Sequence, residues 1–380
     1  MSRAPRGSRR RLGRLGLAPT ALRGHQGAER ERRESGPRRF DEAEAHLSRF
    51  TAFRNAAGAI LALGLAGGVR PALAAPCDAQ ARARLLAPPT PDDDAAALTC
   101  SLRLAPGERI RRRLILEGAQ ASGVELDCNG ASIGEPAPPP RLPYILVEIR
   151  SVPGEPARWQ RPSDVTLRNC TILGQVRVWG MAVNGQGGAL RLSSRSLGHT
   201  ERAQAAAPTR VSILDSQLVA YGQIPLYLGP GVTAFTLRRS SVTGTSPSVG
   251  LYLDAESAGN VVEENTFDIA TAREVVAVDG SARNAIRDNV LAYGYRGGIH
   301  LYRNCGEGGT IRHQTPSDNV ITGNRFRASG LLRPDPVKVG SRGGWGWTMN
   351  CGADAGYPFG SSLDDGDGAT GNVVEGNRVE

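Results

Sequence analysis

The sequence predicts an all-β fold in which the chain winds into a β-solenoid with coils of about 24 residues. Three observations indicate this fold. Asparagine pairs with a spacing of five residues recur along the second half of the chain. Between them lie short runs rich in Val, Ile and Thr, bounded by Gly and Asn, which is typical of strands and turns. Apolar residues rarely recur with the helical period.

The repeat unit is a short strand framed by two asparagines. The pairs are Asn260/Asn265, Asn284/Asn289, Asn319/Asn324 and Asn372/Asn377. From Asn260 to Asn284 is 24 residues, and from Asn284 to Asn319 is 35, one coil plus an insertion. A single coil cannot bury its inner face, so the coils stack around a common column of Val, Leu and Ile. Asparagines at equivalent bends are expected to adopt the left-handed conformation and to hydrogen-bond to the next coil.

The positive charge of the chain is confined to its first part. The formal net charge is +9 over 380 residues, and residues 1–75 hold 15 arginines and 6 acidic residues, a net of +9. The remainder has 31 basic and 31 acidic side chains and is neutral. The basic composition therefore belongs to a leader, and we expect no nucleic-acid partner.

This leader has the features of an export signal. Arg49 and Arg54 precede an apolar run over 56–69, and Ala72-x-Ala74 follows as a cleavage site near Ala74 or Ala75. The run is too short to span a bilayer comfortably. We therefore expect an exported protein, periplasmic or secreted, with no membrane span after cleavage. The domain prediction is a leader over 1–75, an N-terminal cap over 76–122 and the solenoid over 123–380.

All six cysteines follow the leader, and an even number in an exported chain favours disulfides. We expect sequential pairing, although six cysteines allow fifteen connectivities. No C-x-x-C pair indicates zinc. The residues are Cys77, Cys100, Cys128, Cys170, Cys305 and Cys351.

Six strands can be aligned without gaps, one from each coil, and they begin at residues 176, 226, 251, 276, 299 and 337. Alternation sends the first and third residues of each strand into the core. The second residues then form one outward column: Arg177, Tyr227, Tyr252, Ala277, His300 and Lys338. The fourth residues form another: Trp179, Gly229, Asp254, Asp279, Tyr302 and Gly340.

This alignment places Asp254 and Asp279 next to each other on neighbouring coils, about 4.8 Å apart along the solenoid. Adjacent like charges are unfavourable on a sheet, and one carboxyl should have a raised pKa, as general acid–base catalysis requires. The competing interpretation is that both aspartates simply start turns. Glu256 is a nearby substitute for Asp254.

Long insertions follow three of the aligned strands, over about 181–208, 305–317 and 341–370. The intervening coils have almost none, so the insertions should border a groove with the two aspartates on its floor. The aromatic residues of the columns suit stacking against sugar rings, or alternatively pack under the loops. The predicted substrate-binding residues are Arg177, Trp179, Tyr227, Tyr252, Glu256, Arg303, Arg312 and His313.

Lys338 is the only lysine beside 45 arginines, and it lies in the outward column. A compact ammonium differs chemically from a guanidinium, which suggests a functional amine, although a chance codon is the simpler explanation. The acidic run "DDGDG" at 364–368 lacks the glutamate of an EF-hand loop. We expect no cofactor and no metal site; a bound cation such as calcium stays open.

The repeat resembles the right-handed parallel β-helix proteins of the pectin-lyase-like group, over roughly residues 100–380. The resemblance implies a single-domain right-handed parallel β-helix and activity on polysaccharides. Two aspartates on successive coils, followed by a histidine and a basic residue, look similar to the polygalacturonase-type arrangement. On that analogy Asp254 and Asp279 supply acid and base, and His300 orients them. The paired-aspartate dipeptide and the Gly-His-Gly stretch of that type are absent.

The first functional hypothesis is therefore an exported glycoside hydrolase that cleaves an oligo- or polysaccharide with the stacked carboxylates. The second is a polysaccharide lyase or uronate epimerase, in which His300 or Tyr302 takes a proton and Lys338 or Arg303 neutralises the developing charge. The third is a non-catalytic, carbohydrate-binding or envelope scaffold. The sequence does not choose between them, and it does not indicate the oligomeric state.

Overall fold

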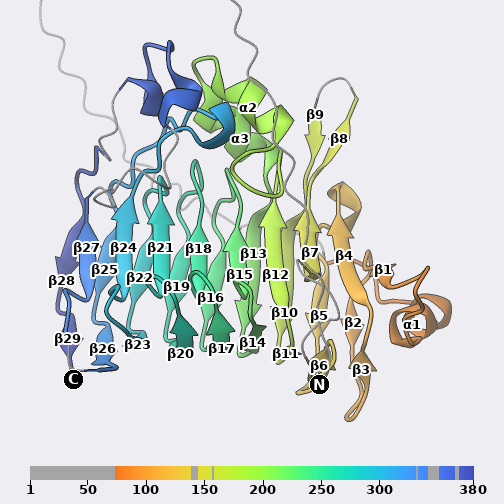
Figure 1. Ribbon diagram of the computed structural model, residues 1–380. Helices are drawn as coiled ribbons and strands as arrows, with labels where there is room; N and C mark the ends of the chain where they lie inside the picture. The colour runs from red at the N-terminus through yellow and green to blue at the C-terminus, as the bar shows by residue number, and fades with distance from the viewer. Residues whose placement is uncertain (1–72, 138–143, 156–157, 331–332, 341–350, 364–367) are drawn as a thin grey trace, which may run out of the picture. The chain divides into compact units, whose positions relative to one another are not determined.

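The computed structural model of the protein describes residues 73–137, 144–155, 158–330, 333–340, 351–363 and 368–380. Apart from its last three residues, the predicted leader over 1–75 lies outside them. The described strands form three parallel sheets of nine strands, and each successive coil adds one strand to each sheet (Figure 1). The predicted parallel β-helix is thereby confirmed.

The three sheets are named here in the order in which the chain visits them within one coil. Sheet 1 consists of β1 (Ala95–Ala97), β4 (Arg113–Glu117), β7 (Ile145–Arg150), β12 (Gln175–Trp179), β15 (Leu226–Leu228), β18 (Leu251–Leu253), β21 (Val276–Asp279), β24 (Ile299–Tyr302) and β27 (Val337–Val339). Sheet 2 consists of β2 (Leu102–Arg103), β5 (Glu125–Asp127), β10 (Ser163–Arg168), β13 (Thr209–Leu214), β16 (Thr236–Arg238), β19 (Val261–Glu263), β22 (Ala285–Arg287), β25 (Val320–Thr322) and β28 (Val373–Glu375). Sheet 3 consists of β3 (Arg109–Ile110), β6 (Ser132–Ile133), β11 (Thr171–Ile172), β14 (Gln217–Tyr221), β17 (Ser241–Ser246), β20 (Thr266–Thr271), β23 (Val290–Tyr293), β26 (Arg325–Ala328) and β29 (Arg378–Val379).

The core is the column of inward side chains that the three sheets enclose. Strand alternation directs Leu251 and Leu253 of β18 inward, and both are fully buried. Val262 of β19 and Phe267 of β20 meet them from the other two sheets and are also fully buried. Each coil contributes one such layer, so the apolar surface is buried only when the coils stack.

Two asparagine ladders run along the corners of the solenoid, as the sequence predicts. Asn260 donates from its backbone N–H and its side-chain amide to Oδ1 of Asn284, 24 residues away, at 3.0 and 2.9 Å. Asn265 bonds to Asn289 in the same way. The left-handed residue, however, is the one before each asparagine, for example Glu264 with φ 58°. That residue turns the corner, so the asparagine keeps an ordinary backbone and points its amide inward.

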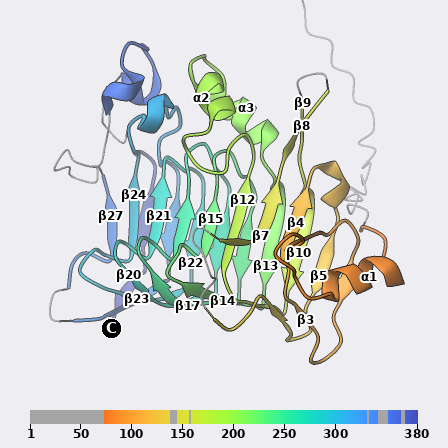
Figure 2. The same cartoon turned by 45° about the vertical axis from the view of Figure 1, so that its right-hand side comes forward.

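The N-terminal end of the solenoid is covered by helix α1 (Ala79–Leu86), which lies beside β1 and β3 (Figure 2). The Asp78 side chain caps this helix by accepting from the Ala81 N–H at 2.7 Å. Leu85 is buried against the core. An antiparallel hairpin, β8 (Val152–Gly154) and β9 (Arg158–Gln160), extends from β7. Within the described residues, no helix has the length and apolar character needed to cross a bilayer.

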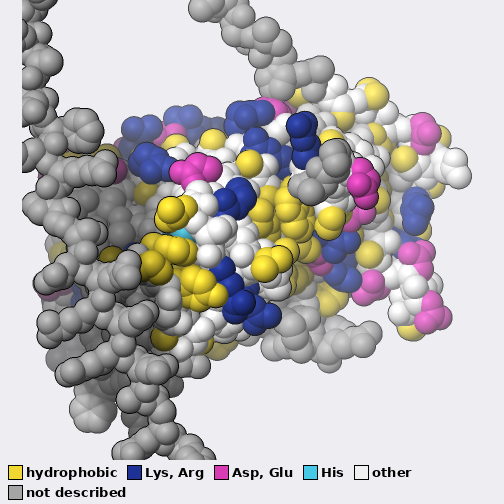
Figure 3. Space-filling model, turned by 90° about the horizontal axis from the view of Figure 1, so that it is seen from above, with side chains coloured by type: hydrophobic (Ala, Val, Ile, Leu, Met, Phe, Trp, Pro, Cys, Tyr) yellow, Lys and Arg dark blue, Asp and Glu magenta, His cyan; other side chains and the backbone are white. Residues whose placement is uncertain are grey.

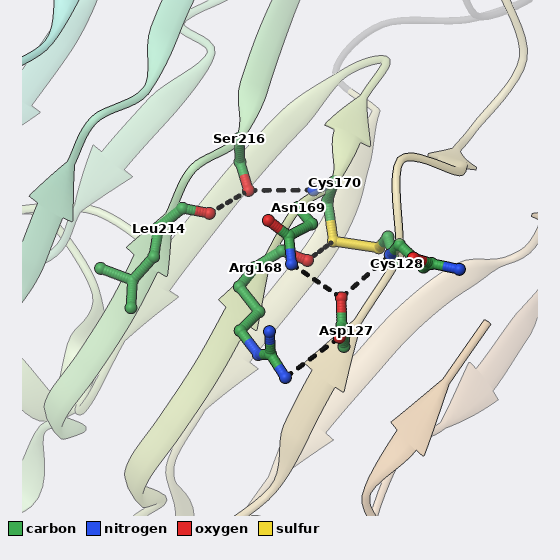
Figure 4. The surroundings of a disulfide bond; sticks show 8 residues. Asp127, Cys128, Arg168, Asn169, Cys170, Leu214 and Ser216 are labelled. Carbon is green, nitrogen blue, oxygen red and sulfur yellow. Dashed lines mark hydrogen bonds and ion pairs between the residues drawn. A yellow bond between two sulfur atoms is a disulfide. The ribbon is translucent and has the colours of Figure 1, made fainter.

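Two of the predicted disulfides are confirmed. Cys77 is bonded to Cys100, and Cys128 to Cys170, which joins the coils of β5 and β10 (Figure 4). Asp127 beside the second disulfide accepts from Asn169 at 2.9 Å and pairs with Arg168 at 3.0 Å. Cys305 is also disulfide-bonded, whereas the side chain of Cys351 lies outside the described residues.

Candidate functional site

The predicted alignment of the sheet 1 strands is confirmed by their pairing. Arg177 of β12 is opposite Tyr227, which is opposite Tyr252 of β18. The column continues through Ala277 and His300 and ends at Lys338 of β27. In the second column, Asp279 is opposite Tyr302. The residues selected from the sequence therefore share one outer face of the solenoid.

The structure differs from the expectation that both aspartates lie open on the floor of a groove. Asp254 follows β18 directly and Asp279 is the last residue of β21, but they are only 1% and 0% exposed. The covering group is Arg312 from the insertion 305–317, itself 2% exposed. Its Nη1 lies 2.8 Å from Oδ1 of Asp254 and 3.4 Å from Oδ2 of Asp279. Arg312, predicted to wall the groove, instead pairs with both carboxylates.

Uncharged hydroxyl and amide groups also donate hydrogen bonds to the two carboxylates. Tyr227 donates its hydroxyl to Asp254, and Tyr252 donates its hydroxyl to Asp279 at 2.6 Å. Asn304 donates to Asp279 twice, from its backbone N–H at 2.8 Å and from its side chain at 2.6 Å. These hydroxyls and amides explain how two adjacent carboxylates are tolerated without solvent.

Burial and neighbouring charges shift the pKa values of four groups in this cluster. Burial raises the pKa of Asp279; the charge of Arg312 opposes this rise, and that of Asp254 adds to it. Burial alone would lower the pKa of Arg312, but the charges of Asp279 and Asp254 raise it well above its usual value. Burial and the neighbouring carboxylates also raise the pKa of Tyr227 and Tyr252. Both tyrosines are therefore hydrogen-bond donors.

Glu256 lies beside this cluster and accepts hydrogen bonds from two of the insertions. Its backbone is left-handed, with φ 63°, and its buried carboxylate accepts from the His313 N–H at 2.7 Å. Thr200 of helix α3 (His199–Ala206) donates to the same carboxylate. Burial raises the pKa of Glu256, against the effect of these hydrogen bonds. Glu256 thus anchors two insertions, and His313 is half-buried among them rather than on an open wall.

The three insertions also contact one another around Arg312. Ser361 of η4 (Gly360–Ser362) accepts from the Arg312 N–H at 3.0 Å and donates its own N–H to the Arg312 carbonyl at 2.9 Å. A Cβ on Gly185 would lie 2.7 Å from an Arg312 nitrogen, so a larger residue would require the Arg312 guanidinium to shift. The remaining described helices of the insertions are α2 (Gly188–Ser194), η2 (Glu307–Gly309) and η3 (Cys351–Asp354). We call the three packed insertions the cap. On the face of the molecule seen in Figure 3, arginine and apolar side chains are interspersed.

His199 is a buried histidine at the start of helix α3 in the cap. Burial lowers its pKa from 6.5 to about 3, and the charges of His313 and Arg202 contribute. Because the folded-state pKa is depressed, the unfolded chain alone takes up this proton below pH 6.5. We expect stability to fall with decreasing pH below 6.5, by at most about 1.4 kcal/mol per pH unit from this group. Urea unfolding of the wild type and His199→Gln should show a weaker acid dependence in the variant. If the free energy of unfolding depended on pH in the same way in both proteins, His199 would not be the group responsible.

The remaining predicted catalytic residues lie one and two coils beyond the aspartates. His300 is half-buried, and its Nε2 lies 3.0 Å from the Gly340 carbonyl, so Nε2 carries the proton in the neutral ring. Tyr302 is fully buried; its hydroxyl accepts from Arg273 at 2.6 Å and donates to Glu274 at 3.2 Å. Lys338 is half-buried.

Some of the other predicted binding residues are buried in the packing of this face, and others are partly exposed. The rings of Tyr227 and Tyr252 stack with centroids 5.2 Å apart, and the Arg177 guanidinium lies 4.3 Å from the Tyr227 centroid. Tyr227 is only 6% exposed, so its ring is part of the packing, whereas Tyr252 is half-buried. Trp179 is half-buried with Arg150 over its ring, and Arg303 is 7% exposed.

Three residues of this face were not predicted from the sequence: Asn304, Arg273 and Glu274. The signal for Asn304 was present, since extending the aligned columns by two residues places Glu256, Ser281 and Asn304 at equivalent positions. Arg273 and Glu274 lie in the turn before β21, outside the aligned strands. No cluster of three or more His, Cys, Asp or Glu side chains suited to a metal ion occurs among the described residues.

No protein-family profile and no curated protein matches the chain. Among solved structures, it is similar to the GH136 lacto-N-biosidase from Eubacterium ramulus, with TM-score 0.43 and 11% identity over 75% of this chain and 51% of that one. An alginate lyase from Paenibacillus has TM-score 0.32 and 10% identity, over 75% and 88% of the two chains. DFA-IIIase from Arthrobacter chlorophenolicus without its lid has TM-score 0.37 and 11% identity, over 80% and 83%.

The chain thus spans about half the length of the lacto-N-biosidase. The three sheets, their parallel register and the asparagine ladders are sufficient to assign the architecture. The chain is a parallel β-helix protein.

Proposed function

We propose that this protein is an exported enzyme that acts on an acidic oligo- or polysaccharide, bound along the outer face of sheet 1. The observation that carries the proposal is a half-exposed series of side chains on stacked coils: Arg177, Tyr252, His300 and Lys338. Arg177 and Lys338 form no ion pair with another described residue. Cations and an aromatic ring on one face suit a sugar that carries carboxylate groups. The disulfides support folding outside the reducing cytosol.

The chemistry that best fits this face is β-elimination or epimerisation of a uronate. His300 takes the proton on the carbon next to the carboxylate, and Lys338, on the adjacent strand, stabilises the negative charge that develops there. In elimination, the bond to the leaving oxygen then breaks, that oxygen takes a proton, and a carbon–carbon double bond forms. Asp254 and Asp279 support this face from below and do not touch the sugar.

Hydrolysis is the second candidate because burial and Asp254 raise the pKa of Asp279, as a general acid requires. Asp279 would protonate the glycosidic oxygen, and Asp254 would act as nucleophile or base. This chemistry requires the cap to move, because Arg312 and the tyrosine hydroxyls occupy both carboxylates.

The test is activity on a panel of acidic and neutral polysaccharides, with reducing ends and near-ultraviolet absorbance of unsaturated uronates followed together. Removing a general base should lower elimination by about a hundredfold or more in His300→Gln. Asp254→Asn should keep the wild-type rate of elimination when that rate is expressed per amount of folded protein. Reducing ends without absorbance, lost in Asp254→Asn, would establish the hydrolase instead. Binding without turnover across the panel would establish the non-catalytic scaffold.

A further inference from the structure

The cap has a small apolar cluster of its own. In the described part of the chain, Ala182, Leu190 and Ala203 are buried against one another, and they belong to a different cluster from the core of the solenoid. Helices α2 and α3, which supply Leu190 and Ala203, lie beyond the carboxyl ends of the sheet 1 strands (Figure 1). The apolar stacking of the coils therefore does not include this part of the cap. Segments that are packed separately open locally at a lower free energy than the core.

Polar contacts attach the cap to the coils beneath it. The Glu256 carboxylate accepts from Thr200 of α3 and from the His313 N–H of the insertion 305–317. The side-chain amides of Gln204 and Gln314 donate to backbone carbonyls of the coils, each at 2.8 Å; the acceptors are Ser257, Gly280 and Glu256. Because water can replace each of these partners, breaking them together costs less than exposing an apolar core.

Two buried polar atoms at this interface have no hydrogen-bond partner in the described protein. They are Nε of Arg312 and Oγ1 of Thr310, and these residues are 2% and 3% exposed. Both residues line a small void between the cap and the coils, together with Ala255 and Glu256. The amide of Asn265 in the ladder, by contrast, uses both its oxygen and its nitrogen. The closed cap is thus paired less completely than the ladder, and both atoms gain hydrogen bonds when the cap lifts into water.

The insertion 181–208 joins the solenoid through a narrow neck. Gly180 precedes the insertion and Ala207 lies at its end, and a Cβ on Gly180 would lie 2.7 Å from Cα of Ala207. The two stems of the insertion therefore touch where they leave the coils. An insertion with adjacent stems can turn as one body, because only a few backbone dihedral angles at the neck have to change.

We propose that the cap is a lid over the two aspartates and that Glu256 is its latch. In the closed form, Arg312 pairs with Asp254 and Asp279 and keeps other groups from them. Lifting the cap withdraws Arg312 and adds the two carboxylates to the sugar-binding face, a step that rests on the proposed function. The closed cap is an autoinhibitory contact for any reaction that uses these carboxylates. A ligand that displaces Arg312 shifts the cap toward the open form.

Cysteine labelling in native buffer tests the lid. Ala255→Cys places a thiol beneath the cap, where Ala255 is 4% exposed and lines the void beside Arg312. Ala220→Cys places a matched thiol in the core, where Ala220 is 2% exposed. With excess maleimide and the wild type as blank, the first thiol should react at least about a hundredfold faster, because it requires only cap opening. Equal rates would mean that the cap opens only on global unfolding, and would overturn the proposal.

The latch is tested in the Ala255→Cys background. Thr200→Val removes the α3 donor to Glu256 and should raise the labelling rate about tenfold or more, as expected for a hydrogen bond to a charged group. The matched control is Thr243→Val, at a half-buried position on the outer side of sheet 3, which should leave the rate unchanged. Equal rates in the two variants, or the same acceleration of labelling at Ala220→Cys, would refute the latch. Neither measurement uses a substrate, so a failure of the lid is distinguished from a failure of the proposed function.

Discussion

Replacing Arg312 by glutamine is expected to destabilise the folded protein by about 3 to 5 kcal/mol, the usual cost of removing one partner of a buried ion pair. Both Asp254 and Asp279 lose their only described cationic partner, and neither has access to water. The glutamine amide can still donate a hydrogen bond but carries no charge. Urea unfolding followed by circular dichroism measures the loss.

The matched control is Arg210→Gln. Arg210 makes two hydrogen bonds to Asp164, at 2.6 and 2.7 Å, but its side chain is 56% exposed. Surface pairs of this kind contribute at most about 1 kcal/mol. Equal losses in the two variants would mean that burial does not determine the role of Arg312, and that the cluster is more hydrated than its contacts indicate.

The loss of folding stability in Arg312→Gln should also depend on pH, and in a defined direction. Without the guanidinium, the pKa of Asp279 in the folded state should rise further above its unfolded value, because burial raises it and the charge of Arg312 opposes this rise. An acid whose folded-state pKa is raised loses stability as pH rises through that interval, because only the unfolded chain ionises freely. The variant should therefore be closest to the wild type in acid and furthest from it at neutral pH. The opposite trend would exclude a charge-pairing role.

Asn289→Ala is the second change with a large expected effect, above about 3 kcal/mol, since each buried group left without a partner costs about 1 to 3 kcal/mol. Asn289 accepts from the backbone and side chain of Asn265, both at 3.0 Å. It donates to the Val262 carbonyl and to Asn324, both at 2.9 Å. Alanine removes all four hydrogen bonds at a position with no exposed surface.

The control for this change is Asn184→Ala in the insertion 181–208. Asn184 is exposed and accepts one hydrogen bond, from the Gln186 N–H at 3.0 Å. Its loss should be within about 0.5 kcal/mol, as for most surface substitutions. Thermal and urea unfolding of both variants would measure the difference. A small loss for Asn289→Ala would show that the ladder follows from coil stacking and does not stabilise it.

The sequence alone determined the coil, its period and the register of the sheet 1 strands. These properties depend on spacing, because stacked parallel strands must repeat the same inward and outward positions at each turn. Arg177, Tyr227, Tyr252, Ala277, His300 and Lys338 were placed in one column for this reason, and their pairing confirms it. The asparagine ladders followed from the same periodicity, but the left-handed residue is the one before each asparagine.

Only the tertiary structure decided what covers this face. Arg312 is 58 residues from Asp254 and lies in an insertion without repeat, so no period relates the two. The insertions pack on one another as well as on the solenoid, and this packing turns two apparently open aspartates into a buried cluster with Arg312. Tyr302, in contrast, is buried against Val249 and Ala277 of the coils themselves. Burial of an outer face depends on contacts between non-repeating segments, whereas stacking depends on the repeat itself.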